Sequence, residues 1–358
     1  MTRLLQGLHF VLALICFGVL SVLVYTLAQG HRVVSQSLPE QLGNTPEKLA
    51  RLADQVNPDD IAFAAMGDVK QGTATFAYLL DLAAQDNVDF AVILGDFVSD
   101  PEPLRHRLFI EQIRQIAPPF PIILVPGNHD VHEDFSFTAD DFSESYGQAQ
   151  FDFVIGRCQF IVLNNVEPYD DTGEYLTFLE QAVTEKADAV DQIFVFMHVP
   201  PKQVNEQIKT RPMAGAERFV ELCKSLEIDY VFTGDHHGYV KTVLGPTTYI
   251  VTGGGGDRLR GDHGQFHHVS RIHIDTDGII DSLIAANKQP EWPQRIERNL
   301  ILHVFPLMIA PRWGPIVTII CLLGLFFAGA NETRLYKKAL KKNITVNRED
   351  TKTQSSQT

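Results

Sequence analysis

The sequence predicts a layered α/β fold, and three observations support this prediction. Short apolar runs, typical of buried strands, alternate with amphipathic stretches of helical periodicity. The apolar runs end in polar residues, which is where open α/β sheets place their functional groups. The 358 residues, 45% of them hydrophobic, have the size and composition of one large globular domain or two smaller ones.

Five apolar runs are each followed by a potential metal ligand. The clearest is the run 122–125, which leads into Gly127-Asn128-His129-Asp130. An asparagine offers a neutral oxygen to a metal, and a histidine exchanges a proton near neutral pH. Gly, Asn and Asp also form ordinary turns, so one such motif alone is ambiguous. Four further coincidences favour a metal centre, and they place Asp68, Asp96, His198 and the cluster Asp235-His236-His237 after apolar runs.

The stretches between these runs have helical spacing. The pattern predicts helices over 72–86, 103–116, 173–186 and 213–225, two strands within 151–165, and a closing hairpin over 269–285. The aromatic and acidic stretch 131–150 follows the Gly-Asn-His-Asp loop. We interpret it as a loop that packs internally, packs at the mouth of the site or contacts the substrate.

These motifs resemble the calcineurin-like metallophosphoesterase family, whose pattern is D-x-H, G-D, G-N-H-D or E, a lone His, and G-H-x-H. The resemblance covers residues 61–281. It implies an α/β fold with two facing mixed β-sheets flanked by helices, a four-layer sandwich with two adjacent metals over the strand ends. It also implies that Asp96 bridges the metals, that Asp68 and His237 hold the first, and that Asn128 and His198 hold the second.

Two positions depart from the family pattern. Lys70 stands where D-x-H has its histidine, and an ammonium cannot ligate a metal unless it loses a proton. Asp235 stands where G-H-x-H has its first histidine, and a carboxylate there still binds a hard cation. We therefore expect one or two divalent ions per chain, of Mn, Fe, Zn or Mg. Lys70 is then a fixed charge near Asp68 or near the phosphate, so we place Lys70 and His236 on the substrate side.

The resemblance also implies the catalytic residues. His129 is expected to act as the acid for the leaving group. In the family an acidic residue three positions after the bridging aspartate orients this histidine, but Ser99 has that spacing here and Asp100 follows it. We predict Asp100 as the orienting residue. The four glycines at 253–256 lack the Lys-Ser/Thr of a nucleotide loop, so we interpret them as a close backbone approach beside the metal site.

Both ends of the chain are apolar enough to predict membrane segments. Residues 8–28 form a nearly unbroken apolar run, so we assign residues 1–30 to a retained anchor or, alternatively, a cleaved signal sequence. We assign 31–59 to a linker, 60–290 to the phosphoesterase domain, and 291–312 to a juxtamembrane segment. Residues 313–331 form the second predicted transmembrane helix, and 332–358 form a basic tail.

Charge predicts the topology and limits the partners. The lysine-rich tail favours a cytoplasmic C-terminus, which places the domain outside the cytoplasm, in the periplasm of a Gram-negative cell. Residues 31–298 contain 21 Lys and Arg against 41 Asp and Glu, and the remaining residues contain 9 against 3. A domain with a net charge of −20 repels polyanions, so no nucleic acid partner is expected. A small phosphoester, including a lipid-linked one, is the better substrate.

The sequence therefore predicts a membrane-anchored, metal-dependent phosphoesterase that uses activated water. Two alternatives remain open at this stage. Because of Lys70, the chain also fits a degenerate member that binds metal or phosphate without turnover. It also fits a membrane-tethered interaction domain.

Overall fold

A computed structural model describes most of the central part of the chain. The described residues are 37–70, 73–166, 173–260 and 264–287, with short terminal pieces at 10–11, 13–21, 24, 292–293, 296, 300, 316, 319–325 and 327. The chain divides into two compact units, one of residues 36–298 and one of residues 1–35 with 299–358. The larger unit contains the predicted site.

The first of two sheets has five strands in the order β11-β10-β1-β2-β3. Strands β1, β2 and β3 are parallel, and β10 is antiparallel to both β1 and β11. The strand bounds are β1 (Asp60–Met66), β2 (Phe90–Leu94), β3 (Ile122–Val125), β10 (His268–Asp275) and β11 (Gly278–Ala285). Buried parallel strands read as continuous apolar runs, which explains the runs seen in the sequence.

The second sheet has six strands in the order β4-β5-β6-β7-β9-β8. Strands β5, β6, β7 and β9 are parallel, and the edge strands β4 and β8 are antiparallel to their neighbours. The bounds are β4 (Phe151–Ile155), β5 (Cys158–Val162), β6 (Gln192–Phe196), β7 (Tyr230–Thr233), β8 (Tyr239–Leu244) and β9 (Thr247–Thr252). Both sheets are therefore mixed, as predicted.

The two sheets pack face to face through phenylalanine side chains. Phe63 lies at the centre, with ring centroids 5.2 to 5.7 Å from those of Phe90, Phe160, Phe194, Phe196 and Phe232. All six side chains are fully buried. Edge-to-face and offset pairs of this kind add to the hydrophobic gain from burial, so this layer fixes the two sheets against each other.

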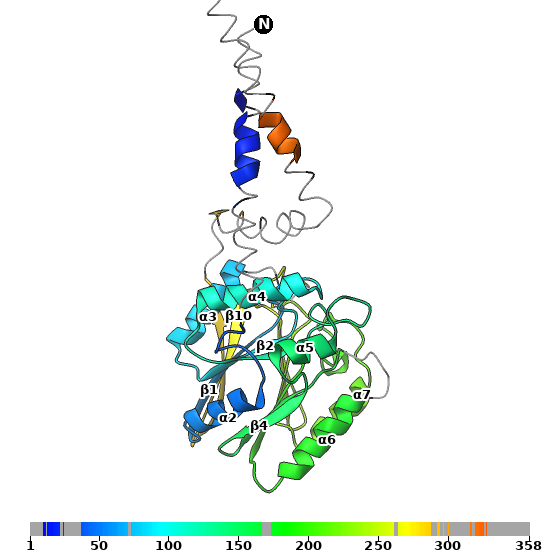
Figure 1. Cartoon of the computed structure of the whole chain (residues 1–358). Coiled ribbons are helices and arrows are strands. Elements are labelled where there is room, and N and C mark those ends of the chain that lie inside the picture. Colours follow the sequence, from blue (N-terminus) through cyan, green and yellow to red (C-terminus); the bar gives the residue numbers. More distant parts are fainter. Residues whose placement is uncertain are drawn as a thin grey trace, which may run out of the picture. The chain divides into compact units, whose positions relative to one another are not determined.

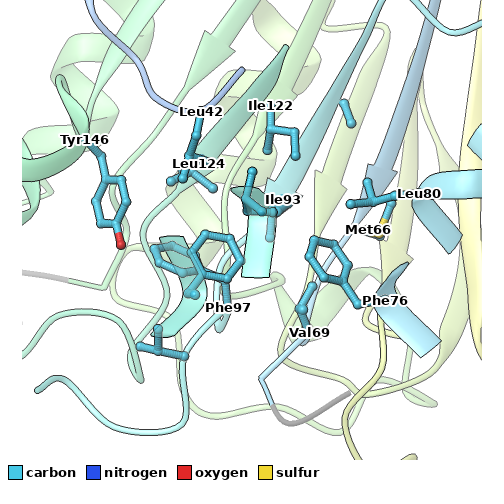
Figure 2. Close-up of a cluster of buried hydrophobic side chains, with 14 of the residues drawn as sticks. Leu42, Met66, Val69, Phe76, Leu80, Ile93, Phe97, Ile122, Leu124 and Tyr146 are labelled. Atoms are coloured by element: carbon cyan, nitrogen blue, oxygen red, sulfur yellow. The ribbon is translucent and has the colours of Figure 1, made fainter. Parts of the chain in front are cut away.

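Helices cover the outer face of each sheet. Helices α3 (Thr73–Gln85), α4 (Pro103–Ile116) and α5 (Ala139–Tyr146) pack on the first sheet, and α6 (Glu174–Lys186) and α7 (Ala216–Ser225) pack on the second (Figure 1). Figure 2 shows part of the hydrophobic core between the first sheet and its helices, where Met66 of β1 lies near Phe76 and Leu80 of α3. The arrangement confirms the two mixed sheets with flanking helices.

Two helices correct the sequence-based assignment. Residues 31–59 were assigned to a linker, yet α2 (Pro46–Gln55) belongs to the folded domain, with Leu49 and Leu52 buried in the core between the sheets. Thr45 caps this helix by accepting a hydrogen bond from the Lys48 N–H. The stretch 131–150 was interpreted as a loop, but α5 forms within it because Thr138 and Asp141 make a reciprocal capping box.

The predicted membrane segments fall mostly outside the described residues. Among the residues that the structure describes, no helix has both the length and the apolar character needed to cross a bilayer. The segments 1–30, 291–312 and 313–331 are described only in short pieces, and the tail 332–358 lies entirely outside the described residues. The predicted anchors therefore remain predictions.

A buried histidine of α4 makes stability depend on pH. His106 is 2% exposed; its Nδ1 lies 3.1 Å from the Tyr146 hydroxyl and its Nε2 lies 2.9 Å from the Asp130 carbonyl oxygen. Burial lowers the pKa of His106 to about 3. Below its ordinary pKa of about 6.5, the unfolded chain therefore binds a proton that the folded protein does not.

Because of this histidine, we expect the free energy of unfolding to fall by about 2 kcal/mol when the pH is lowered from 7 to 5. Urea unfolding at both pH values, for the wild type and for His106→Gln, isolates its contribution. The wild type should lose about 2 kcal/mol more than the variant as the pH falls. Equal losses in the two proteins would show that His106 is protonated in the folded state.

Candidate metal centre

The predicted site residues meet where the parallel strands of both sheets end. Asp68 follows β1, Asp96 follows β2, Asn128 follows β3, His198 follows β6, and the segment 235–237 follows β7. The loops are close enough to exchange backbone hydrogen bonds, such as Gly234 N–H to His198 O at 2.9 Å. The polar residues that follow the apolar strands therefore lie together at the carboxyl ends of these strands, as the chain order predicts.

The backbone of the loops that form the site is strained. Five non-glycine residues of the site have left-handed φ angles, namely Asp68 (57°), Lys70 (25°), Asp96 (56°), Asp235 (57°) and His237 (55°). Each such residue costs on the order of 1 kcal/mol or more, and such strain gathers at functional sites. Neighbouring glycines allow the packing, because a Cβ on Gly127 would lie 2.2 Å from the Asp96 nitrogen.

A buried carboxylate holds these loops in position. Asp130 is fully buried and accepts four backbone hydrogen bonds, from Asp96 N (2.7 Å), Phe97 N (2.9 Å), Val98 N (3.0 Å) and Gly127 N (2.8 Å). Burial and the nearby Asp96 raise the pKa of Asp130 despite these bonds. The last residue of the Gly-Asn-His-Asp motif is therefore a scaffold for the loop that contains Asp96.

One group of ligands converges on His198. Its Nδ1 lies 2.7 Å from the Leu94 carbonyl oxygen, so Nδ1 bears the proton and Nε2 presents a lone pair. That Nε2 lies 3.3 Å from Asp96 Oδ1, 3.2 Å from Asn128 Oδ1 and 3.8 Å from Asp235 Oδ1. Three oxygens and one nitrogen, all able to donate electron pairs, thus face one point. Such a set fits a divalent cation.

Asp235 is positioned from the opposite side by the loop 205–213. Its Oδ2 accepts hydrogen bonds from the Thr210 hydroxyl and from Arg211 N at 3.2 Å, and Arg211 Nε lies 3.5 Å from Oδ1. Burial acts to raise the pKa of Asp235, yet the Arg211 guanidinium and the hydrogen bond from Thr210 hold it below its ordinary value. The carboxylate that replaces the family histidine is therefore charged and aimed at His198.

A second group consists of Asp68, Asp96 and His237. Like the set of Asp96, His198 and Asp235, it has ligand atoms within 4.8 Å of one another. His237 Nδ1 lies 2.9 Å from the Arg258 carbonyl, and its Nε2 lies 3.2 Å from Asp68 Oδ1. Neither oxygen of Asp68 receives a hydrogen bond from the described part of the chain. Burial, and then Asp96, raises the pKa of Asp68 well above its usual range.

Lys70 lies against this second group. Its Nζ is 2.8 Å from Asp96 Oδ2 and 3.7 Å from Asp257 Oδ2, and the side chain is 5% exposed. Burial acts to lower the pKa of Lys70, but Asp96 and Asp68 raise it overall. The lysine predicted on the substrate side is therefore a buried cation paired with the bridging carboxylate. A positive charge here does not fit a metal ion in the same group.

Asp257 is a site residue that sequence analysis missed. Its Oδ2 also lies 3.5 Å from His237 Nδ1, and its backbone N–H donates to the Asp68 carbonyl at 2.9 Å. The sequence could have indicated Asp257 because it directly follows the glycines 253–256. These glycines approach the site closely, in agreement with the interpretation of the sequence. A Cβ on Gly253 would lie 2.4 Å from Asp68 Oδ2.

His129 lies beside the convergent group, but Asp100 does not orient it. The His129 N–H donates to Asp96 Oδ1 at 2.9 Å, and its Nδ1 lies 2.6 Å from the Ser99 carbonyl oxygen. Asp100 instead accepts a hydrogen bond from the Ser99 hydroxyl and lies 3.7 Å from Arg105 Nε. The backbone carbonyl of Ser99 therefore replaces the acidic side chain that was predicted for this role.

His236 is buried rather than exposed to a substrate. It is 1% exposed, and its Nδ1 accepts a hydrogen bond from Lys209 N at 2.9 Å. This contact ties the loop 205–213 to the end of β7. The structure therefore gives His236 a role in holding the loop, where the sequence predicted substrate binding.

The two mixed sheets and the ligand groups at their strand ends define a metallophosphoesterase fold. Residues 61–239 match the family model described as calcineurin-like phosphoesterase. This match covers half of the chain, and the chain belongs to that family.

Solved structures are similar to the chain at low sequence identity. Purple acid phosphatase PPD1 from yellow lupin seeds matches with a TM-score of 0.50 and 14% identity, over 63% of this chain and 51% of that one. GAP50, the anchor in the inner membrane complex of Plasmodium, gives 0.48 and 13%, over 68% and 95%. A dimetal phosphatase from Danio rerio gives 0.48 and 12%, over 63% and 98%. No curated protein sequence matches the chain.

Proposed function

We propose that this chain hydrolyses a small phosphoester with a divalent ion held by Asp96, Asn128, His198 and Asp235. The observation that supports this most is the His198 geometry. Its lone-pair nitrogen lies within 3.8 Å of three oxygens from three other loops. Electron-pair donors gathered at this distance are stabilised by a shared cation.

The bound ion would act as a Lewis acid that activates water and stabilises charge on the phosphoryl oxygens. The chain's own residues do the rest. Because Nδ1 of His129 faces the Ser99 carbonyl, Nε2 is the nitrogen that exchanges a proton with the leaving group. Arg211 and Lys70 supply fixed positive charge next to two of the carboxylates. That charge offsets the repulsion between an acidic domain and an anionic substrate.

Hydrolysis of chromogenic phosphate esters tests this function. The purified full chain should hydrolyse p-nitrophenyl phosphate or bis-p-nitrophenyl phosphate with added Mn²⁺ and should lose this activity with EDTA. His198→Ala should be inactive, while His273→Ala, which removes a surface partner of Asp60, should remain active. A protein that binds Mn²⁺ but turns over neither ester would instead be the degenerate binding member, and the proposal would be wrong.

The role of His129 predicts a dependence on the leaving group. His129→Ala should lower kcat by about a hundredfold or more for an alkyl phosphate, whose leaving oxygen needs a proton. The loss should be much smaller for a p-nitrophenyl ester, because p-nitrophenolate leaves without protonation. Steady-state kinetics with both esters measure the two losses. Equal losses with both leaving groups would assign His129 to binding or positioning instead.

Membrane attachment is also part of the proposal, with the domain outside the cytoplasm and the C-terminal tail inside. It is supported by the described residues near both ends, where large apolar side chains are exposed, including Phe10 (63%), Phe17 (66%), Ile320 (62%) and Phe327 (64%). Exposed apolar faces of this kind fit a lipid environment. Reporter fusions at the C-terminus, read with a phosphatase active only outside the cytoplasm, test the topology. A strongly active phosphatase fusion would show that the C-terminal tail lies outside the cytoplasm, and the proposed topology would be wrong.

A further inference from the structure

We propose that the Lys70 ammonium takes the place of one of the family's two ions, so that this centre binds a single divalent ion. The ion lies with Asp96, Asn128, His198 and Asp235. The inference rests on the metal centre of the proposed function and specifies its stoichiometry. It also makes Lys70 a built-in cation of the site, where the sequence placed it on the substrate side.

The two oxygens of Asp96 already have different partners. Oδ1 lies 3.3 Å from His198 Nε2 and accepts from the His129 N–H, whereas Oδ2 lies 2.8 Å from Lys70 Nζ. Asp96 belongs to both ligand groups, so a second ion would also depend on this carboxylate. Here the oxygen that faces the group with Asp68 and His237 is bound to an ammonium. A divalent ion in that group would have to share Oδ2 with a positive charge.

The ammonium is held firmly in this position. The Lys70 backbone N–H donates to the Asp96 carbonyl at 2.9 Å, which ties the two loops together. Asp257 lies 3.7 Å from Nζ, so a second carboxylate also attracts the ammonium. With 5% of its side chain exposed, Lys70 has little solvent into which its charge could move. An incoming ion would therefore meet a cation that is buried and paired, which opposes binding.

The charges of the centre balance with one ion. Four carboxylates face the two groups, from Asp68, Asp96, Asp235 and Asp257, and contribute four negative charges when ionised. Lys70 and Arg211 contribute two positive charges through their contacts with Asp96 and Asp235. One divalent ion supplies the remaining two. A second divalent ion would leave a buried excess of two positive charges before any substrate binds.

The two groups also differ in their ligands. The group at His198 has three oxygens around a lone-pair nitrogen, which is a nearly complete set for a metal ion. The group at His237 contains Asp68 and Asp96, and Asp96 is paired with Lys70. The ion is therefore expected at His198.

Metal stoichiometry and electron paramagnetic resonance test this inference in the full chain. After loading with Mn²⁺ and removal of weakly bound metal, the wild type should hold one equivalent and give the six-line spectrum of an isolated Mn²⁺ ion. Lys70→His restores a nitrogen ligand and removes the charge, so it should hold two equivalents with a spin-coupled spectrum. Lys202→His, at an exposed position in the 3₁₀ helix Lys202–Val204 after β6, is the matched control and should stay at one. Two equivalents in the wild type, or a folded Lys70→His variant that stays at one, would overturn the inference.

A second variant decides the matter if Lys70→His does not fold. Asp68→Asn keeps the shape of the side chain and should retain one equivalent, because the ion is not bound at Asp68. A loss of the ion in this variant would contradict the proposal. Neither measurement depends on turnover. A protein with one ion and no hydrolase activity would refute the proposed function alone, and an active protein with two ions would refute this inference alone.

Discussion

Replacing Asp96 with asparagine is expected to remove the bound ion and to lower kcat/KM for phosphoester hydrolysis by about a thousandfold or more. Asp96 is the one residue that belongs to both ligand groups. Burial acts to raise its pKa, yet the Lys70 ammonium holds the pKa below its usual value, so the carboxylate is charged. The amide keeps the shape but loses the charge that attracts the cation. It also leaves Lys70 without its nearest partner.

Metal analysis and steady-state kinetics of Asp96→Asn measure both losses in one preparation. Asp191→Asn is the control, since it changes an exposed carboxylate that pairs with Arg157 on the surface. It should retain wild-type activity and metal content. A folded Asp96→Asn protein with more than about a tenth of the wild-type kcat/KM would contradict a role for the ion in hydrolysis.

Replacing Asp130 with alanine is expected to lower the free energy of unfolding by on the order of 4 kcal/mol or more. The carboxylate is fully buried and accepts hydrogen bonds from four backbone N–H groups of two loops. Its removal leaves these donors buried without a partner, and each unsatisfied group costs about 1–3 kcal/mol. The loop that presents Asp96 would also lose its support, so the bound ion should be lost with it.

Urea unfolding of Asp130→Ala and Asp130→Asn measures this effect. The asparagine variant keeps one acceptor oxygen and should lie between alanine and the wild type. Asp134→Ala, an exposed position in the same loop region, is the control and should change stability by less than about 0.5 kcal/mol. A loss of less than 1 kcal/mol in Asp130→Ala would show that water replaces the carboxylate, and the scaffold role would be wrong.

The sequence predicted most of the layered core. Buried strands such as β2 (Phe90–Leu94) are continuous apolar runs, and α4 (Pro103–Ile116) has a clear helical period with proline at its first turn. Helix α5 was missed, and the helical pattern at 46–56 was assigned to a linker instead of the domain, for physical reasons. Helix α2 is mostly polar and short, and only its packing against the core between the sheets makes it part of the domain. Helix α5 is marked by a capping box that the acidic and aromatic composition concealed.

The sequence predicted which residues come together at the site, but it did not predict all of their side-chain contacts. One ligand at the end of each strand is visible in the sequence, because parallel strands end at a shared edge. The sequence does not show in which direction each of these side chains points. Asp100 has a suitable spacing but faces Arg105, whereas the Ser99 carbonyl, which no side-chain pattern reveals, contacts His129. Asp257 reaches Lys70 and His237 because the loop that begins with the glycines is hydrogen-bonded to Gly67 and Asp68, just after β1.

An anomalous difference map of Mn²⁺-loaded crystals is the most direct test of the proposed centre. We predict a peak within bonding distance of Asp96 Oδ1, Asn128 Oδ1, His198 Nε2 and Asp235 Oδ1, the four atoms that converge here. A well-ordered site without such a peak at saturating Mn²⁺, or with these four side chains turned away from one another, would contradict the proposed hydrolase.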